Sequence, residues 1–364
     1  MGYAEDLVAW FDQNRRDLPW RRTRDPFRIW VSEVMLQQTR AEVVIPYYER
    51  FLARFPTVEE LAGAPVEEVL AAWSGLGYYR RARQLHAAAR TLAGSAERQA
   101  GGGPVFPASV EGWRALPGVG AYTAAAVASI AFAAPVPVLD GNVARVLSRF
   151  LAAQEDPRSR QGREKLLAAA AALLAGGRPG DSNQALMELG ATICSPRRPK
   201  CPRCPLRNGC RAAGQGDPER FPSPRPRRGS ERHRLIVAVV ESRGRILLFR
   251  RSAGDPLLGG TWELPWVEVE HPRGPAPPQP ERALADKYGG RWALGPGLGV
   301  VRHGITYRHL MVAVHRADLH GGDEVGEGSE AGWFDAGERA GLPLGALVGK
   351  ALAKAGASHR GSDN

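Results

Sequence analysis

The sequence lacks a hydrophobic run long enough to cross a membrane. Its longest stretch without a charged residue covers 25 residues, 115–139, and prolines at both ends leave only 121–134 as an uninterrupted helical segment. Such a segment extends about 21 Å at about 1.5 Å per residue, which is shorter than the ~30 Å hydrocarbon core of a bilayer. We therefore expect a buried, alanine-rich helix here and no contact with a membrane.

Targeting signals are also missing. The N-terminal sequence MGYAEDLVAW has no basic region followed by an apolar core, so it does not resemble a secretory signal peptide. Asp6 stands where the N-myristoylation pattern requires serine or threonine. These absences predict a cytoplasmic protein.

The composition excludes several classes of chain. Hydrophobic residues make up 43% and charged residues 24%, which is ordinary for a globular protein and argues against disorder, collagen and coiled coil. A length of 364 residues predicts two or three domains. The 49 basic residues exceed the 38 acidic ones, for a net charge of +11, which favours a polyanionic partner.

Composition changes along the chain in a way that predicts separate domains. Residues 1–214 are expected to be helical, because apolar residues recur three and four positions apart, as at Val66, Val69, Leu70 and Trp73. Residues 215–234 are rich in proline, glycine and arginine and read as a basic linker.

After the linker the pattern becomes that of an α+β domain. Residues 235–355 hold β-branched strands and a helix near 281–288, and 356–364 form a tail. The apolar runs 235–240 and 245–250 are separated by Ser-Arg-Gly and predict a β-hairpin.

The few cysteines lie together. All four fall within seventeen positions in the spacing C-x6-C-x2-C-x5-C: Cys194, Cys201, Cys204 and Cys210. Nothing in the sequence indicates export, so disulfides are disfavoured. Structural zinc normally uses two closely spaced pairs, and only one such pair exists, so the wide loops favour an iron–sulfur cluster over zinc. The surrounding loop is basic and predicts phosphate contact.

A glycine turn precedes the alanine-rich helix. Gly118 and Gly120 flank Val119, and backbone N–H groups in such a turn, beside a helix N-terminus, can bind a phosphate without reading base sequence. A plain turn remains the alternative. No strand precedes the turn, which disfavours a dinucleotide-binding fold.

Two carboxylates stand in unusual surroundings. Glu33 lies among Val31, Val34, Met35 and Leu36; it is either an ordinary solvent-facing residue or, if it faces a pocket, an acid with a raised pKa. Asp140 precedes a helix, where it is either a simple N-cap or a carboxylate kept ionised by the helix N-terminus. An acid and an anion of this kind are what cleavage of a glycosidic bond requires.

These motifs together resemble the helix-hairpin-helix DNA glycosylases, and specifically the MutY-type adenine DNA glycosylases. The resemblance rests on LPWR (18–21), WVSEVMLQQTR (30–40), GLGYYRRAR (75–83), LPGVGAYTA (116–124), VLDGNVARVLSR (138–149), NQALMELGATIC (183–194) and the cysteine spacing. It implies an all-α glycosylase half with an iron–sulfur cluster loop, followed by an α+β Nudix-like domain. The implied six-helix barrel covers about 24–131, and the cluster module combines about 1–23 with 132–214.

The resemblance also implies roles for single residues. Glu33 matches the acid that protonates adenine, Asp140 the carboxylate that stabilises the sugar cation, and Tyr122 and Asn142 the residues that position them. The implied adenine-pocket residues are Trp20, Arg21 and Gln184. The implied DNA contacts are Gln37, Gln38, Thr39, Tyr78, Gly118, Val119 and Gly120, with Gln38 and Tyr78 as the wedges that enter the duplex as the base flips out. The four cysteines match the ligands of one 4Fe-4S cluster.

One position distinguishes members of this superfamily. Enzymes that also cut the DNA strand commonly carry a lysine where this chain has Tyr122, and a phenol cannot form a Schiff base. The resemblance therefore implies a monofunctional N-glycosylase.

The C-terminal half resembles the family's Nudix-like recognition domain more weakly. Where the family often has Phe-Ser-His for probing the oxidised guanine, this chain has Ile305-Thr306-Tyr307, so Thr306 is the expected contact. The helix PERALADKYGG lacks the glutamate cluster with which Nudix hydrolases bind magnesium, which argues against pyrophosphohydrolysis.

The resulting expectation is removal of adenine mispaired with 8-oxoguanine or guanine in double-stranded DNA, by a monomer that associates with the nucleoid. The alternatives are a related glycosylase for another base and a non-catalytic DNA-binding iron–sulfur protein.

Overall fold

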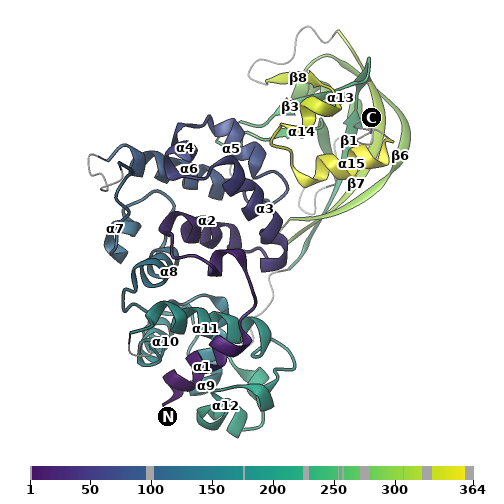
Figure 1. The fold of residues 1–364 in the computed structure, drawn as a ribbon. Coiled ribbons are helices and arrows are strands. Elements are labelled where there is room, and N and C mark those ends of the chain that lie inside the picture. Colours follow the sequence, from purple (N-terminus) through teal and green to yellow (C-terminus); the bar gives the residue numbers. More distant parts are fainter. Residues whose placement is uncertain are drawn as a thin grey trace. The chain divides into compact units, whose positions relative to one another are not determined.

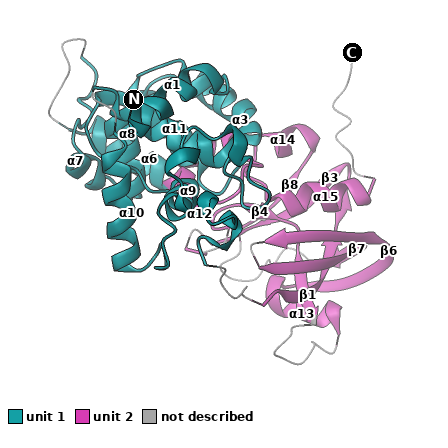
Figure 2. Ribbon diagram, turned by 90° about the horizontal axis from the view of Figure 1, so that it is seen from below, with its two compact units in different colours: residues 1–63, 84–226 teal, residues 64–83, 227–364 magenta. Residues whose placement is uncertain are grey.

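The chain folds into two compact units in this computed structural model. The first comprises Met1–Gly63 and Gln84–Pro226, and the second comprises Ala64–Arg83 and Arg227–Asn364 (Figure 2). The structure describes residues 2–95, 102–174, 177–223, 229–252, 254–255, 258–270, 279–305, 307–321 and 330–356. Within these residues no helix combines the length and apolarity that spanning a membrane requires.

The first unit is helical, as predicted (Figure 1). Its α-helices are α1 (Tyr3–Asn14), α2 (Pro26–Leu36), α3 (Ala41–Arg54), α4 (Val58–Gly63), α7 (Val110–Arg114), α8 (Ala121–Phe132), α9 (Gly141–Leu151), α10 (Arg160–Ala172), α11 (Pro179–Thr192) and α12 (Arg211–Gly214). Short 3-10 turns are η1 (Pro19–Arg21), η2 (Cys201–Arg203), η3 (Arg207–Gly209) and η4 (Pro218–Arg220). Helix α6 (Arg80–Ala93) begins in the second unit and ends in the first.

The alanine-rich helix α8 is buried, as predicted from its sequence. Every side chain from Thr123 to Ile130 is buried, and α2, α7 and α11 pack against the helix. Small residues permit this close approach: a Cβ on Gly180 of α11 would lie 2.6 Å from the carbonyl oxygen of Ser129. Helix α2, which carries Glu33, therefore packs on α8, and α9, which Asp140 caps, packs on α11.

The second unit contains the strands. It comprises α5 (Val66–Ala72), β1 (Glu231–Val239), β2 (Glu241–Ser242), β3 (Arg245–Arg250), β4 (Trp262–Glu263), β5 (Trp266–Glu270), α13 (Pro280–Tyr288), β6 (Arg291–Ile305), β7 (Arg308–His320), β8 (Ala331–Phe334), α14 (Ala336–Ala340) and α15 (Ala346–Lys354). One sheet has the order β5-β1-β7-β6, with β1 and β7 parallel, and the other has β2-β3-β4, with β8 also paired to β3. Strand β1 begins inside the range 215–234 that was expected to be linker.

The prediction that residues 235–240 pair with residues 245–250 in a hairpin is wrong. β1 pairs with β5 and β7, and only the two residues of β2 form a hairpin with β3. The turn between them is tight because Arg243 and Gly244 both have positive φ. The chain therefore leaves the first sheet after Val239, so the two apolar runs belong to different sheets.

Both faces of these strands are covered, which explains why their sequences are apolar without alternation. Leu235, Val237 and Val239 share a core with α15, whereas Ala238 and Val240 share another with α13. Successive side chains of a strand point to opposite faces. The helix expected near 281–288 is α13.

The compact units and the predicted domains divide the chain differently. Residues 64–83 lie inside the predicted helical domain 1–214, but they pack with C-terminal residues in the second unit. This segment includes α5 and the turn that carries Tyr78.

Candidate active site

A cleft of about 920 Å³ lies in the first unit. Residues of η1, α2, α8, α9 and α11 line it. It brings together these predicted residues: Trp20, Arg21, Glu33, Gln37, Gln38, Thr39, Tyr122, Asp140, Asn142 and Gln184. Side chains from distant parts of the chain thus share one cavity.

Glu33 faces this cleft from a helix that is almost wholly buried. Helix α2 is set by its first residues: the Asp25 carboxylate accepts hydrogen bonds from two backbone N–H groups, and Pro26 fits the first helical position. Residues 29–35 of the helix are all buried, and Glu33 is only 5% exposed. The solvent-facing interpretation of Glu33 is therefore wrong.

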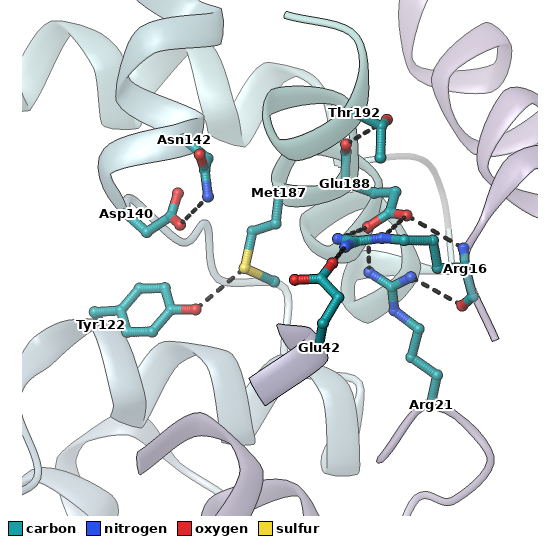
Figure 3. A network of polar contacts seen from close by, with 9 residues as sticks. All are labelled: Arg16, Arg21, Glu42, Tyr122, Asp140, Asn142, Met187, Glu188 and Thr192. Atoms are coloured by element: carbon teal, nitrogen blue, oxygen red, sulfur yellow. Dashed lines mark hydrogen bonds and ion pairs between the residues drawn. The ribbon is translucent and has the colours of Figure 1, made fainter. Parts of the chain in front are cut away.

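The surroundings of Glu33 favour its protonated form. Burial raises the pKa of Glu33 to about 7, the hydrogen bond from Tyr122 opposes this, and the nearby charge of Asp140 raises it further. The Tyr122 hydroxyl donates to Oε2 of Glu33 at 2.8 Å. The same hydroxyl lies 3.1 Å from Sδ of Met187 (Figure 3). A carboxyl group near half-protonation at neutral pH can deliver a proton.

Asp140 caps helix α9 at the edge of the same cleft. Its Oδ1 accepts a hydrogen bond from the Val143 N–H at 2.7 Å. Its Oδ2 accepts one from the Asn142 amide at 3.2 Å (Figure 3). Asn142 is fixed in turn, since its Oδ1 accepts from Arg145 at 2.9 Å. Helix α11 approaches closely here, because a Cβ on Gly190 would lie 2.7 Å from that of Asn142.

The segment before Asp140 is held by a buried asparagine. Asn183 donates to Ser129 Oγ at 2.9 Å and to the Val136 carbonyl at 2.8 Å, and it accepts from the Val138 N–H at 3.1 Å. Backbone groups of an extended segment that is partly buried need such partners. Sequence reasoning did not single out Asn183, although its polar side chain at the start of an apolar helix was a usable signal.

Opposing influences act on the pKa of Asp140. Burial raises this pKa above its ordinary value, although hydrogen bonds from Val143 and Asn142 and the charge of Arg145 lower it. Because those groups donate to the charged form, they still oppose protonation. Asp140 is thus a partly buried carboxylate with hydrogen bonds directed at its oxygens.

Two arginines meet a glutamate on the other wall of the cleft. Arg16 donates to both carboxylate oxygens of Glu188, at 2.8 and 2.9 Å, and Arg21 donates to Oε2 at 2.8 Å (Figure 3). Burial alone would raise the pKa of Glu188, but the hydrogen bonds and charges of the arginines bring it to about 2. Sequence reasoning missed Glu188, which lies one helical turn after Gln184 on the same face.

The remaining predicted cleft residues are ordered by neighbouring groups. The Trp20 ring packs edge-on against Tyr48, with ring centroids 5.4 Å apart. Gln37 donates to Thr123 Oγ1 at 3.4 Å, and Thr39 donates to the Gln37 carbonyl at 3.3 Å. Gln38 has a φ of 56°, an uncommon conformation for a residue with a side chain.

The glycine turn lies outside the residues that line the cleft. Gly118 has a φ of 73°, and Gly120 caps α8 from an exposed position, while Val119 is buried. The turn therefore presents its backbone to solvent beside a helix N-terminus.

Two of the predicted DNA contacts, Tyr78 and Thr306, do not lie in the first unit. Tyr78 lies in the second unit, is 42% exposed and has a φ of 51°, so it is not a core residue. Thr306 falls outside the residues that the structure describes.

The four cysteines line one small pocket, separate from the cleft. Its other walls include Val146, Phe150, Ile193 and Leu206. No described cysteine is in a disulfide, and no group of three His, Cys, Asp or Glu among the described residues is placed to hold a single metal ion. Four thiols around one apolar pocket suit a group larger than a single ion.

Arg149 holds the cysteine loop against helix α9. This buried arginine donates to the carbonyls of Ser195 at 2.7 Å, Pro196 at 2.9 Å and Phe221 at 3.0 Å, and it contacts Cys194 Sγ at 3.3 Å. The basic residues of the loop are all exposed: Arg197, Arg198, Lys200, Arg203, Arg207 and Arg211.

Comparison with known proteins agrees with this arrangement. Residues 31–171 match the HhH-GPD superfamily of base excision DNA repair proteins, and residues 236–354 match the NUDIX domain. The adenine DNA glycosylase of Mycolicibacterium smegmatis is 38% identical over 77% of this chain and 88% of the relative. The chain belongs to the adenine DNA glycosylase family.

The family relationship extends to longer eukaryotic proteins. The adenine DNA glycosylases of rat and human are 39% and 37% identical, and this chain spans 61% and 67% of their lengths. A thermostable thymine-DNA glycosylase of known structure is 31% identical, with a TM-score of 0.52, and matches 58% of this chain and 95% of that one. This adenine DNA glycosylase family member thus has the helical glycosylase fold followed by a Nudix-like domain.

Proposed function

We propose that this chain is a monofunctional adenine DNA glycosylase that acts on double-stranded DNA carrying adenine opposite 8-oxoguanine or guanine. The observation that carries the proposal is the buried Glu33, hydrogen-bonded to Tyr122, in the same cleft as Asp140. Burial of Glu33 costs the hydration of its carboxyl group, and, unlike the buried Glu188, Glu33 is hydrogen-bonded by a tyrosine hydroxyl rather than by arginines, so it can carry a proton to a leaving base.

The two carboxyl groups divide the work of breaking the C1′–N9 bond. Protonated Glu33 gives its proton to the purine ring, so that the base leaves as a neutral molecule. The Asp140 carboxylate stabilises the positive charge that grows on the sugar. Water then adds hydroxide to C1′ and its remaining proton goes to a base such as the ionised Glu33. The test is release of adenine from a mispaired duplex.

Tyr122 supports a reaction that stops at base removal. Its hydroxyl donates to Glu33, and the pKa of this partly buried phenol is raised well above its ordinary value by desolvation and by the two nearby carboxylates. A neutral phenol is a weak nucleophile and cannot form the imine that precedes strand cleavage.

Contacts to DNA are assigned to backbone N–H groups, to basic side chains and to single polar and aromatic residues. The Val119 N–H already donates to the Leu116 carbonyl at 3.2 Å, so the N–H groups of Gly118 and Gly120 are the ones assigned to a backbone phosphate, and the basic cysteine loop can bind another. Tyr78 and Gln38 serve as wedges in the duplex, and Thr306 is the proposed contact to the oxidised guanine. The proposed adenine pocket combines Trp20, Arg21 and Gln184, where the Arg21–Glu188 pair fixes the guanidinium.

The four cysteines are proposed to hold one 4Fe-4S cluster. Cys194, Cys201, Cys204 and Cys210 would be its ligands, and the apolar walls of their pocket would exclude water from it. When bound, the cluster would act structurally, because its bonds to the four thiolates would tie together the turns of the basic loop.

Purified protein should therefore contain about four iron atoms per chain, as one such cluster requires. Cys201→Ser should lose the iron and also weaken DNA binding at low salt, because the basic loop loses its shape. Iron analysis by mass spectrometry and binding to undamaged duplex check this. Stoichiometric zinc without iron after anaerobic purification would contradict the proposal.

A further inference from the structure

The turn that presents Tyr78 has an unusual backbone. Three of its residues, Gly75, Gly77 and Tyr78, have φ values of 92°, 76° and 51°. A tyrosine in the left-handed region is strained and persists only where surrounding contacts enforce it. The question is therefore which contacts hold Tyr78 in this conformation.

One set of contacts comes from the turn's own segment. The indole of Trp73 donates to the Gly77 carbonyl at 3.1 Å, and Arg81 donates to the same oxygen at 3.0 Å. The Arg81 guanidinium also lies 5.3 Å from the centre of the Tyr78 ring. These contacts fix the carbonyl that immediately precedes Tyr78.

A second set comes from the C-terminal part of the chain. The Tyr79 hydroxyl donates to the Leu344 carbonyl at 2.6 Å, and the Leu344 N–H donates to Ser74 Oγ at 3.3 Å. The Gly75 N–H donates back to the Tyr79 hydroxyl at 3.4 Å. Leu344 lies 265 positions after Tyr79 in the sequence. Its carbonyl therefore binds Tyr79 at one end of the turn, and its N–H binds Ser74 at the other end.

Leu344 is itself anchored to the sheet. The Trp262 N–H of β4 donates to the Pro343 carbonyl at 2.9 Å, and Trp262 and Leu344 form a parallel bridge. Leu344 packs at the margin of the core that β1, β7 and α15 share. A continuous set of contacts thus runs from the sheet to the turn.

We infer that Tyr79 and Ser74 are positioning residues, through which the C-terminal part of the chain sets the conformation of Tyr78. The inference rests on the proposed function, in which Tyr78 enters the duplex. The C-terminal part then contributes to recognition in two ways: by any direct contact to the opposite base, and by holding Tyr78 ready for insertion. The second contribution requires no contact between Tyr79 and DNA.

The test is Tyr79→Phe, which removes the hydroxyl and keeps the buried ring. The matched control is Tyr288→Phe, because Tyr288 is also buried in this unit and its hydroxyl also bonds a backbone group, that of Trp266. Ser74→Ala is the second variant. Dissociation constants are measured in the full chain, with a duplex that carries a non-cleavable adenine analogue opposite 8-oxoguanine.

Tyr79→Phe and Ser74→Ala should each weaken binding about three- to tenfold, the range for loss of one buried hydrogen bond, whereas Tyr288→Phe should change it less than about twofold. In a Tyr78→Ala background Tyr79→Phe should have no further effect, because the residue that it positions is gone. If the wild type releases adenine, two results would overturn this inference alone. Either Tyr79→Phe weakens binding equally with and without the Tyr78 side chain, or it does not weaken binding at all. A wild type that releases no adenine would overturn the proposed function as well.

Discussion

Glu33→Gln should slow adenine release by at least ~10²-fold, the usual range for loss of a general acid. The amide has nearly the same shape and still meets the Tyr122 hydroxyl, but it has no proton to give to the leaving purine. Binding to a mispaired duplex should persist, because the cleft keeps its volume and its arginines. Single-turnover release of adenine and the dissociation constant for the same duplex are the measurements.

The pH dependence separates this role from a structural one. Because burial raises the pKa of Glu33 to about 7, the wild-type rate should be highest below about pH 7 and should fall as the pH rises through that value and the carboxyl group ionises. The fall should be missing from the residual rate of Glu33→Gln. Glu164→Gln is a matched control on the exposed face of α10 and should change nothing. Near-normal release by Glu33→Gln would remove Glu33 from the reaction.

Asp140→Asn should also reduce adenine release by at least ~10²-fold, as removal of a preorganised electrostatic group commonly does. Asparagine caps helices about as well as aspartate, so α9 should still begin at Gly141. The substitution therefore removes the negative charge that stabilises the sugar cation and leaves the cap in place. Release of adenine and the thermal unfolding temperature should be measured together.

Asp25→Asn is the control for this change. Asp25 caps α2 through the same kind of side-chain hydrogen bond but does not line the cleft. We expect both variants to unfold near the wild-type temperature, and only Asp140→Asn to lose activity. Unchanged release by Asp140→Asn would show that Asp140 is a helix cap and nothing more.

Much of the fold follows from local pattern in the sequence. The apolar spacing in the first half predicted helices. It did not predict which helices pack together, because the close approach of α8 and α11 depends on a small residue, Gly180, at their contact. The hairpin error has a physical cause: the runs that became β1 and β3 are buried on both faces, so their sequences carry no alternation to indicate which sheet each joins.

The candidate site was predictable in its residues but less so in its electrostatics. The cleft gathers Glu33, Tyr122 and Asp140 from three helices, and no local pattern contains that convergence. The pKa of Asp140 depends on how far it is buried, which sequence position does not reveal. The sequence did not indicate Glu188 or Asn183 as site residues. The role of Glu188 follows from its ion pairs with two arginines, and that of Asn183 from its hydrogen bonds to the backbone before Asp140.

The measurement that tests the central claim most directly is base release by the wild-type chain from duplexes with a single adenine opposite 8-oxoguanine, guanine or thymine. Each reaction is analysed with and without alkali, which converts an abasic site into a strand break. We predict alkali-dependent breaks at adenine opposite 8-oxoguanine and guanine, none at adenine paired with thymine, and few breaks without alkali. Intact adenine in every duplex, with iron present and DNA bound, would contradict the account.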